Sequence, residues 1–198
     1  SSSRAPNLER PSVTERIGVG AGPDEDMERF AHLVQYLFGV PAAVVSLMEE
    51  DRHILPGLVG LGEPWSSSRQ VGPTSEEEPV RPDQEAGQDP AAPVAKALGA
   101  VSWAGAPLTD AEGRVLGFLI AMDTAARTWK DRERDALHAL AHVCGAELRL
   151  RLLVHESRKN RAQAQRAYER SQMLLRTADE LAGATGPVLV RRAVKALL

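Results

Sequence analysis

The sequence predicts an α+β fold, in which an antiparallel sheet is flanked by helices and a long helical extension follows at the C-terminal end. Two apolar runs surround the short polar loop 109–113, and a loop of this kind with Gly near its end is typical of a β-hairpin. In the second run, 115–122, both alternating sets of side chains are apolar, so this strand should lie centrally and be covered on both faces. Residues 129–182 carry helical apolar stripes at both ends and a polar stretch free of helix breakers between them.

Composition limits the class of protein. A chain of 198 residues with 43% hydrophobic content can bury one domain core and carry an extension. A net charge of -3 argues against binding of nucleic acid, because a duplex is bound by clustered Lys and Arg on one face. The single cysteine, Cys144, forms no intrachain disulfide, and no run approaches the ~20 apolar residues of a membrane span. We therefore expect a soluble, cytoplasmic protein that has neither nucleic acid nor a membrane as a partner.

The first long helix is predicted to follow a flexible N-terminal arm. Residues 1–23 are rich in Ser, Pro, Gly and charged residues and show no sustained period. Asp24 or Asp26 offers an N-cap, and Gly39 followed by Pro41 ends the helix. Between these signals the apolar residues recur at helical spacing, at Met27, Phe30, Ala31, Val34, Leu37 and Phe38.

A hairpin and a long loop come next. Residues 42–48 form a short buried strand, an acidic turn occupies 49–51, and 52–60 return as a second strand. From 62 to 88 Gly, Pro, Ser and Glu dominate without any period, so we expect a long loop of the kind that is functional or mobile. Its run of three glutamates, 76–78, is most simply a solvated charge run. Asp89 and Pro90 then start a short helix that Gly99 ends.

The last helix is predicted to begin after Thr128 and to pack against a partner. Its pattern weakens over 156–166 and resumes at Met173, so the rod would reach about 80 Å at 1.5 Å per residue. A domain of ~130 residues cannot cover such a rod, and the simplest partner is a second copy. We expect the homodimer interface to be the helical stripe made of Leu137, Leu140, Ala141, Cys144, Leu148 and Leu152.

Two further segments are expected beyond this domain. Residues 156–182 are predicted to be a helical signalling linker. The segment Gly183–Gly186 should break the helix, and Pro187 should start another, whose apolar face runs to Leu198. We expect 183–198 to be the start of a following domain in a longer protein.

The order helix, hairpin, long loop, short helix, hairpin, long helix resembles a GAF domain, a small-molecule sensor module built on an antiparallel sheet. The resemblance covers roughly residues 24–155. These motifs are similar to GAF sensors of actinobacterial type, which precede SpoIIE-like PP2C serine phosphatases or histidine kinases, and they imply a C-terminal output domain. The segments that carry the resemblance are Gly39–Leu47, Asp51–Arg52, Val59–Leu61, Glu63–Trp65, Trp103–Leu108, Gly113–Gly117 and Asp123–Thr124 before Trp129.

The resemblance implies that a ligand, if one binds, lies between the sheet and residues 62–98. No cofactor is evident, because the loop has no cysteine to tether a bilin and the chain lacks the Asn-Lys-Phe-Asp-Glu run of cyclic-nucleotide-binding GAF domains. The segment from Trp65 to Trp103 is also shorter than in the family and lacks the helix that commonly walls the pocket. Both tryptophans fit a ligand platform or a filled core equally well. The candidate ligand-binding residues are Ser46, Met48, Trp65, Ser102, Trp103 and Phe118.

Two other segments carry motifs that could indicate a site. His138 and His142 have the spacing of two metal ligands, but Ala139 stands where the zinc-protease pattern needs Glu, and two half-buried interface histidines are the simpler interpretation. The run 155–160 faintly resembles the phospho-acceptor box of histidine kinases, although its polar continuation favours a solvated helix. The chain contains no catalytic motif that we can identify, so we expect no metal site and no enzyme activity within it.

These patterns together predict a regulatory sensor that dimerises through its terminal helices and controls a C-terminal output domain, most simply a SpoIIE-type PP2C serine phosphatase. Two alternatives stay open. The first is a degenerate GAF domain that serves only for dimerisation or protein docking. The second is the sensor part of a histidine kinase.

Overall fold

The computed structural model describes residues 12–20, 22–50, 52–72 and 89–196, with side chains described as far as Glu180 in the last helix. The chain divides into two compact units, 1–155 and 156–198, and each is treated by itself. Residues 1–11 of the predicted N-terminal arm and residues 73–88 of the predicted long loop lie outside the described residues.

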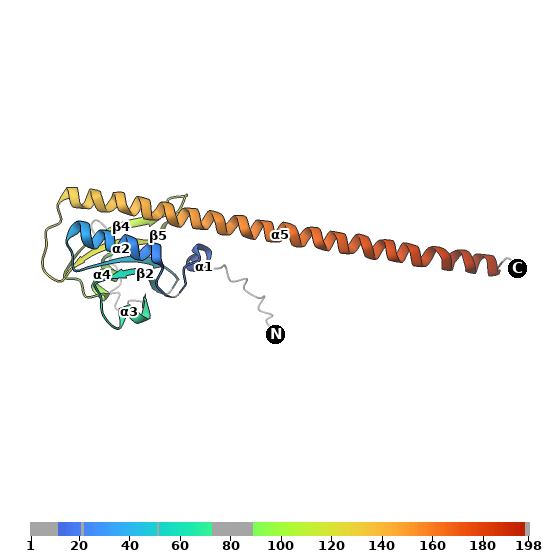
Figure 1. The fold of residues 1–198 in the computed structure, drawn as a ribbon, viewed down its shortest axis with the longest axis horizontal. Coiled ribbons are helices and arrows are strands. Elements are labelled where there is room, and N and C mark those ends of the chain that lie inside the picture. Colours follow the sequence, from blue (N-terminus) through green and yellow to red (C-terminus); the bar gives the residue numbers. More distant parts are fainter. Residues whose placement is uncertain (1–11, 21, 51, 73–88, 197–198) are drawn as a thin grey trace, which may run out of the picture. The chain divides into compact units, whose positions relative to one another are not determined.

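The first unit is a five-stranded antiparallel sheet with helices on both faces (Figure 1). The strand order is β3-β2-β1-β5-β4, and every neighbouring pair is antiparallel. This confirms the predicted α+β class and both predicted hairpins. In chain order the elements are α1 (Val13–Ile17), α2 (Glu25–Phe38), β1 (Ala42–Met48), β2 (His53–Val59), α3 (Trp65–Ser68), β3 (Gln70–Val71), α4 (Ala92–Ala97), β4 (Ser102–Thr109), β5 (Val115–Asp123) and α5 (Asp131–Ala196).

Strand β5 is the centre of the sheet, as its doubly apolar sequence predicted. It pairs with β1 on one side and β4 on the other, and all its residues from Leu116 to Met122 are buried. Gly117 is required here, because a Cβ at this position would overlap the backbone carbonyl of Ser46 on β1. The glycine therefore lets the two central strands approach closely.

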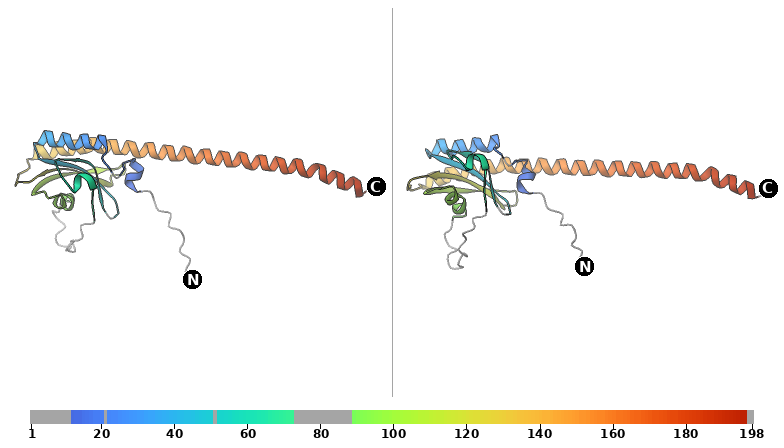
Figure 2. Two further views of the ribbon diagram at one scale, coloured as in Figure 1. Left: turned by 60° about the horizontal axis from the view of Figure 1, so that its bottom comes forward. Right: turned by 90° about the horizontal axis from the view of Figure 1, so that it is seen from below.

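One face of the sheet is covered by α2 and by the first part of α5 (Figure 2). Cys144 on α5 and Met27 on α2 meet there, with their sulfur atoms 3.8 Å apart. The assignment of the α5 stripe to a homodimer interface is wrong: Leu140 is partly buried against the core of its own domain, and the other members are buried within it. An apolar stripe requires a cover, and here α2 and the sheet of the same chain provide it. The buried members are Leu137, Ala141, Cys144, Leu148 and Leu152.

The other face of the sheet is covered by α4. A Cβ at Gly105 of β4 would overlap the Cβ of Ala91, the N-cap residue of α4, so helix and strand are in direct contact. Val94, Ala95 and Leu98 bury this helix against side chains of the three central strands. The face where the resemblance placed a ligand is therefore an apolar core.

Three local predictions differ from the structure. The described part of the predicted loop 62–88 contains helix α3 and strand β3, because β3 pairs with the edge of β2. Residues 13–17, expected to be part of a flexible arm, form α1; Ser12 and Glu15 make a capping box, and Ile17 anchors the turn in the core. Five residues are too few to show a helical period in the sequence. The predicted break at 183–186 is also wrong, because the backbone of α5 continues as a helix to Ala196.

In the second unit, the described residues 156–180 of α5 are all exposed. No helix among the described residues combines the length and the apolar character needed to cross a bilayer.

Candidate functional site

The predicted ligand-binding residues fall into two groups. Ser46 and Phe118 lie opposite each other on β1 and β5 and are buried, and Trp65 and Trp103 pack partly buried against the same α4-covered face. Met48 is 39% exposed at the end of β1, so it does not join them. The sixth residue, Ser102, is half-buried at the start of β4, and its hydroxyl has no hydrogen-bond partner among the described residues.

Trp103 is held by the segment that leads into α4. Its Nε1 donates to Oδ2 of Asp89 at 3.0 Å, and Oδ1 of the same carboxylate accepts from the backbone amide of Ala91, also at 3.0 Å. The ammonium group of Lys96 lies 5.8 Å from the centre of the Trp103 ring, within cation–π range. Trp103 thus fastens α4 to the sheet, which favours the core-filling interpretation over a ligand platform.

His53, which was not among the predicted site residues, faces Ser46. Nδ1 of His53 lies 3.0 Å from the Ser46 hydroxyl. Burial of the imidazole lowers the pKa of His53 below its usual 6.5, so the ring is neutral at pH 7. The signal was present in the sequence, since a serine inside an apolar strand needs a hydrogen-bond partner once it is buried.

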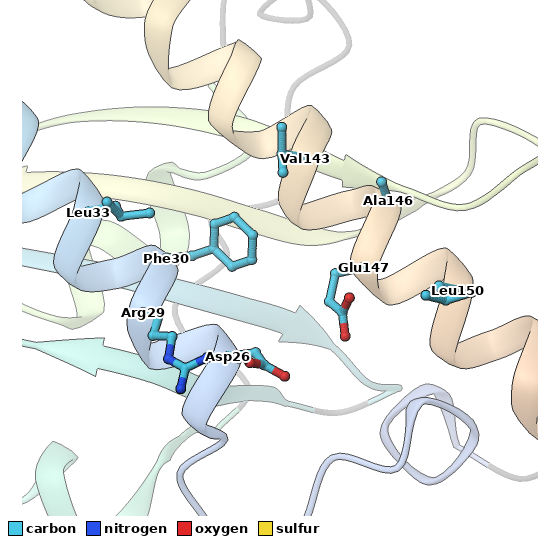
Figure 3. Close-up of a pocket in the computed structure, with 8 residues that line it drawn as sticks. All are labelled: Asp26, Arg29, Phe30, Leu33, Val143, Ala146, Glu147 and Leu150. Atoms are coloured by element: carbon cyan, nitrogen blue, oxygen red, sulfur yellow. Dashed lines mark hydrogen bonds and ion pairs between the residues drawn. The ribbon is translucent and has the colours of Figure 1, made fainter.

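A groove lies between α2 and α5 on the outside of the domain, and no sequence pattern pointed to it. Its volume is about 530 Å³. Phe30 and Leu33 line one side from α2, and Val143, Ala146 and Leu150 line the other from α5 (Figure 3). Asp26, Arg29 and Glu147 add charge at one end. The groove is therefore an apolar trough with a charged end, open along the helix pair.

Arg151 joins the two walls of this groove at its charged end. Its guanidinium makes a bidentate pair with Asp24, at 2.7 and 3.2 Å, and also bonds Asp26 at 2.7 Å and Glu147 at 2.9 Å. Asp24 is at the same time the N-cap of α2 and accepts from the Met27 amide. One arginine on α5 thus holds the cap of α2 together with two further carboxylates.

The charges of this cluster stabilise one another. Burial acts to raise the pKa of Asp24, but the hydrogen bonds from Arg151 and from the Met27 amide outweigh it, and the pKa lies below its usual value. The hydrogen bond to Asp24 is also the main cause of a raised pKa for Arg151. The pair therefore favours the ionised form of both groups.

A second arginine ties the opposite ends of the same two helices. Arg127 donates to the carbonyl of Phe38, the last residue of α2, at 2.9 Å and to Glu133 near the start of α5 at 2.7 Å. Its guanidinium lies 4.5 Å from the centre of the Trp129 ring. The antiparallel helices α2 and α5 are therefore tied together at both ends by an arginine. We call the contacts of Arg127 and those of Arg151 the two clasps, and the groove lies between them.

The remaining motif residues form no reactive cluster. Within the described residues no three of His, Cys, Asp and Glu are placed to hold a metal, and His138 and His142 are exposed on α5. Burial raises the pKa of the Cys144 thiol to about 12, so this thiol is unreactive.

Comparison with known proteins identifies the domain type. The family model described as GAF domain matches residues 23–148. None of the curated proteins compared with the chain matches it.

The chain is also similar to solved GAF domains, at low identity. The PixJ GAF domain of Thermosynechococcus elongatus, in its blue-light absorbing form, is 15% identical and has a TM-score of 0.48, with 82% of this chain and 98% of that chain covered. The second GAF domain of DevS from Mycobacterium smegmatis is 16% identical, with a TM-score of 0.45 and coverages of 69% and 96%. The GAF domain of an Acinetobacter phosphoenolpyruvate-protein phosphotransferase is 15% identical, with a TM-score of 0.45 and coverages of 75% and 92%.

Proposed function

Because the chain belongs to the GAF domain family, we propose that it is the regulatory sensor region of a cytoplasmic signalling protein, that it works as a homodimer, and that it controls an output domain attached after it. GAF domains are regulatory modules rather than catalytic ones. The observation that carries the proposal is the double role of α5. Its first part is a core element of the domain, and the same helix continues as the linker segment 156–182.

This arrangement suits signal transfer. A contact that alters the domain acts on α5 through the core residues and through the two arginine clasps, because both bind α5 directly. A helix with two discrete packings can pass such a bias along its length, provided that the input favours one packing over the other. The linker needs no chemistry of its own for this role.

For the output we favour a PP2C-type serine phosphatase of the SpoIIE kind, on the resemblance of the motifs in 39–129, with a histidine kinase as the second choice. The test uses the full-length protein and compares wild type with Arg151→Gln, which opens one clasp without touching the output domain. Phosphate release from a phosphoserine peptide should change at least about twofold. Arg132→Gln, an exposed change on the same helix, serves as the control. Equal rates of phosphate release in all three proteins would show that the Arg151 clasp does not control the output domain.

A second candidate function has a specific observation in its favour. The α4-covered face is packed, with Gly105 against Ala91 and Trp103 bonded to Asp89. This supports a degenerate GAF domain that takes its input from a protein contact or serves only for dimerisation. Native mass spectrometry separates the two functions, since a sensor of small molecules should carry or accept a ligand and a docking module should not.

A further inference from the structure

The groove between α2 and α5 presents large apolar side chains that the described residues leave in water. Leu33 is 44% exposed on α2, and Val143 and Leu150 are each 56% exposed on α5. The apolar surface extends beyond Leu33 along α2, since Leu37 follows at a spacing of four and is 58% exposed. Apolar surface gathered in this way marks an interaction site, because a partner that covers it gains the free energy of burial.

The shape of the groove fits one helix. From Val143 to Leu150 the α5 wall rises by seven residues, about 10 Å, so two to three turns of a helix can cover it. The small side chain of Ala146 lies between these two larger ones, and a ridge of side chains on a third helix can enter there (Figure 3). Phe30 and Leu33 form the opposite wall.

One end of the groove carries a surplus of negative charge. Asp26 and Glu147 line this end, with Arg29 beside them. The ion pairs around it join four carboxylates to two guanidinium groups, which leaves a net charge of -2. The carboxylates are those of Asp24, Glu25, Asp26 and Glu147, and the guanidinium groups are those of Arg29 and Arg151. A cationic group placed at this end would therefore be attracted.

We propose that the groove binds an amphipathic helix of a different protein. The bound helix has apolar side chains at spacings of three and four along one face, and lysine or arginine in the turn that reaches Asp26 and Glu147. This is the helix-in-groove mode of peptide recognition. The inference supplies an input surface for the proposed regulatory role and rests on that role only for its purpose. The binding itself requires neither an output domain nor a homodimer.

A second copy of this chain fits the groove less well. The same groove on another copy is concave at the same place, so two grooves that face each other leave the space between them unfilled. Where the two acidic ends meet, their like charges also repel. A separate helix is convex and fills the groove, and a basic turn at its end matches the acidic end.

The test is fluorescence anisotropy of two synthetic peptides titrated with the whole chain. Both peptides are helices of about 18 residues, with leucine along one face and alanine and glutamine elsewhere. The basic peptide carries two lysines in its last turn, and the acidic peptide carries two glutamates at the same positions. We expect the basic peptide to bind at least about tenfold more tightly, because its lysines are attracted by Asp26 and Glu147 and the glutamates are repelled.

Matched variants locate the binding surface. Leu33→Gln should weaken binding of both peptides at least about fivefold, because it removes an apolar side chain from the wall of the groove. Leu153→Gln is its control, since Leu153 is 61% exposed on α5 but does not line the groove, and it should bind as the wild type does.

The acidic end is tested by Glu147→Gln. This change should lower the preference for the basic peptide by about threefold, because one of the two lining carboxylates is removed. Its control is Glu50→Gln, which changes an exposed carboxylate in the turn after β1 and should leave the preference unchanged. A merely structural role of Glu147 would weaken both peptides alike and would not change their ratio.

Equal binding of the two peptides by the wild type would overturn the proposal, as would binding that Leu33→Gln leaves unchanged. Failure of both peptides to bind would overturn it as well, and light scattering then identifies the alternative. A dimer that Leu33→Gln dissociates would show that a second copy covers the groove. The comparison of phosphate release between wild type and Arg151→Gln uses no peptide, so failure of the binding test leaves the proposed control of the output domain standing.

Discussion

The two faces of α5 can be told apart by one pair of matched substitutions, Leu148→Ala and Leu150→Ala. The two leucines lie two residues apart on one helix, but Leu148 is 0% exposed in the core, whereas Leu150 is 56% exposed and lines the groove between α2 and α5. Truncating a fully buried leucine costs about 2–5 kcal/mol, because transfer energy is lost and a cavity is left. That is a large part of the ~5–15 kcal/mol that stabilises a typical domain.

The expected result follows from a urea titration read by tryptophan fluorescence. With a slope of ~2 kcal/mol per molar urea, a loss of about 3 kcal/mol lowers the midpoint of Leu148→Ala by roughly 1.5 M. This shift should be the same at two protein concentrations tenfold apart, because the lost contacts lie within one chain. Leu150→Ala should change the free energy of unfolding by no more than about 0.5 kcal/mol, because its side chain is largely exposed.

The reverse pattern would refute this reasoning. If Leu148→Ala shifted mass in solution while its midpoint held, the original interpretation of the stripe as a dimer interface would be right and the packing of α5 onto α2 wrong. A midpoint that falls equally in both variants would mean that Leu150 also belongs to the folded core.

Three further perturbations test the site. Arg151→Gln should lower the free energy of unfolding by about 1–3 kcal/mol, measured by urea titration, because Asp24 and Asp26 lose their charged donor. The pKa of His53 is lowered in the folded protein, so the stability that depends on the neutral imidazole is complete above pH 6.5 and is lost as the pH falls below 6.5. Thermal unfolding between pH 7.5 and 5 should show this loss of stability. The loss should be smaller in His53→Gln. Gly105→Ala should destabilise the domain by about 1–3 kcal/mol in the same urea assay, because its Cβ would overlap Ala91.

Each of these variants has a control in the same chain. Arg132→Gln and His32→Gln change exposed residues on α5 and α2, and neither should alter the urea midpoint or the pH profile. Gly62→Ala adds a Cβ that meets nothing within 4 Å, and it should be neutral. A control that behaves like its partner variant would show that the effect comes from the residue type and not from the contact.

The sheet was predictable because its patterns are local. The doubly apolar run at 115–122 and the polar loop at 109–113 specify a central strand and its hairpin without any long-range information, and both predictions are confirmed. The same holds for α2, whose cap at Asp24 and stop at Gly39 stand directly beside its apolar stripe.

The cover of α5 could not be predicted in the same way. A stripe of leucines predicts that one face of a helix is buried, but it does not predict which surface covers that face. The deciding contacts join residues more than a hundred positions apart, such as Met27 with Cys144 and Asp24 with Arg151. The groove between α2 and α5 was missed for the same reason, because no single segment contains both of its walls.

The two faces of α5 also limit how such a domain can signal. Turning the helix by one residue is a rotation of about 100°, which would carry Leu137, Leu148 and Leu152 out of the core together. At about 1.5–3 kcal/mol for each buried leucine, that movement costs roughly 5–9 kcal/mol, before the clasps of Arg127 and Arg151 are counted. Coupling energies between sites are typically about 1–3 kcal/mol, too small to drive it. A signal from this domain to its linker must therefore be a displacement of α5 smaller than one residue, or the opening of a clasp.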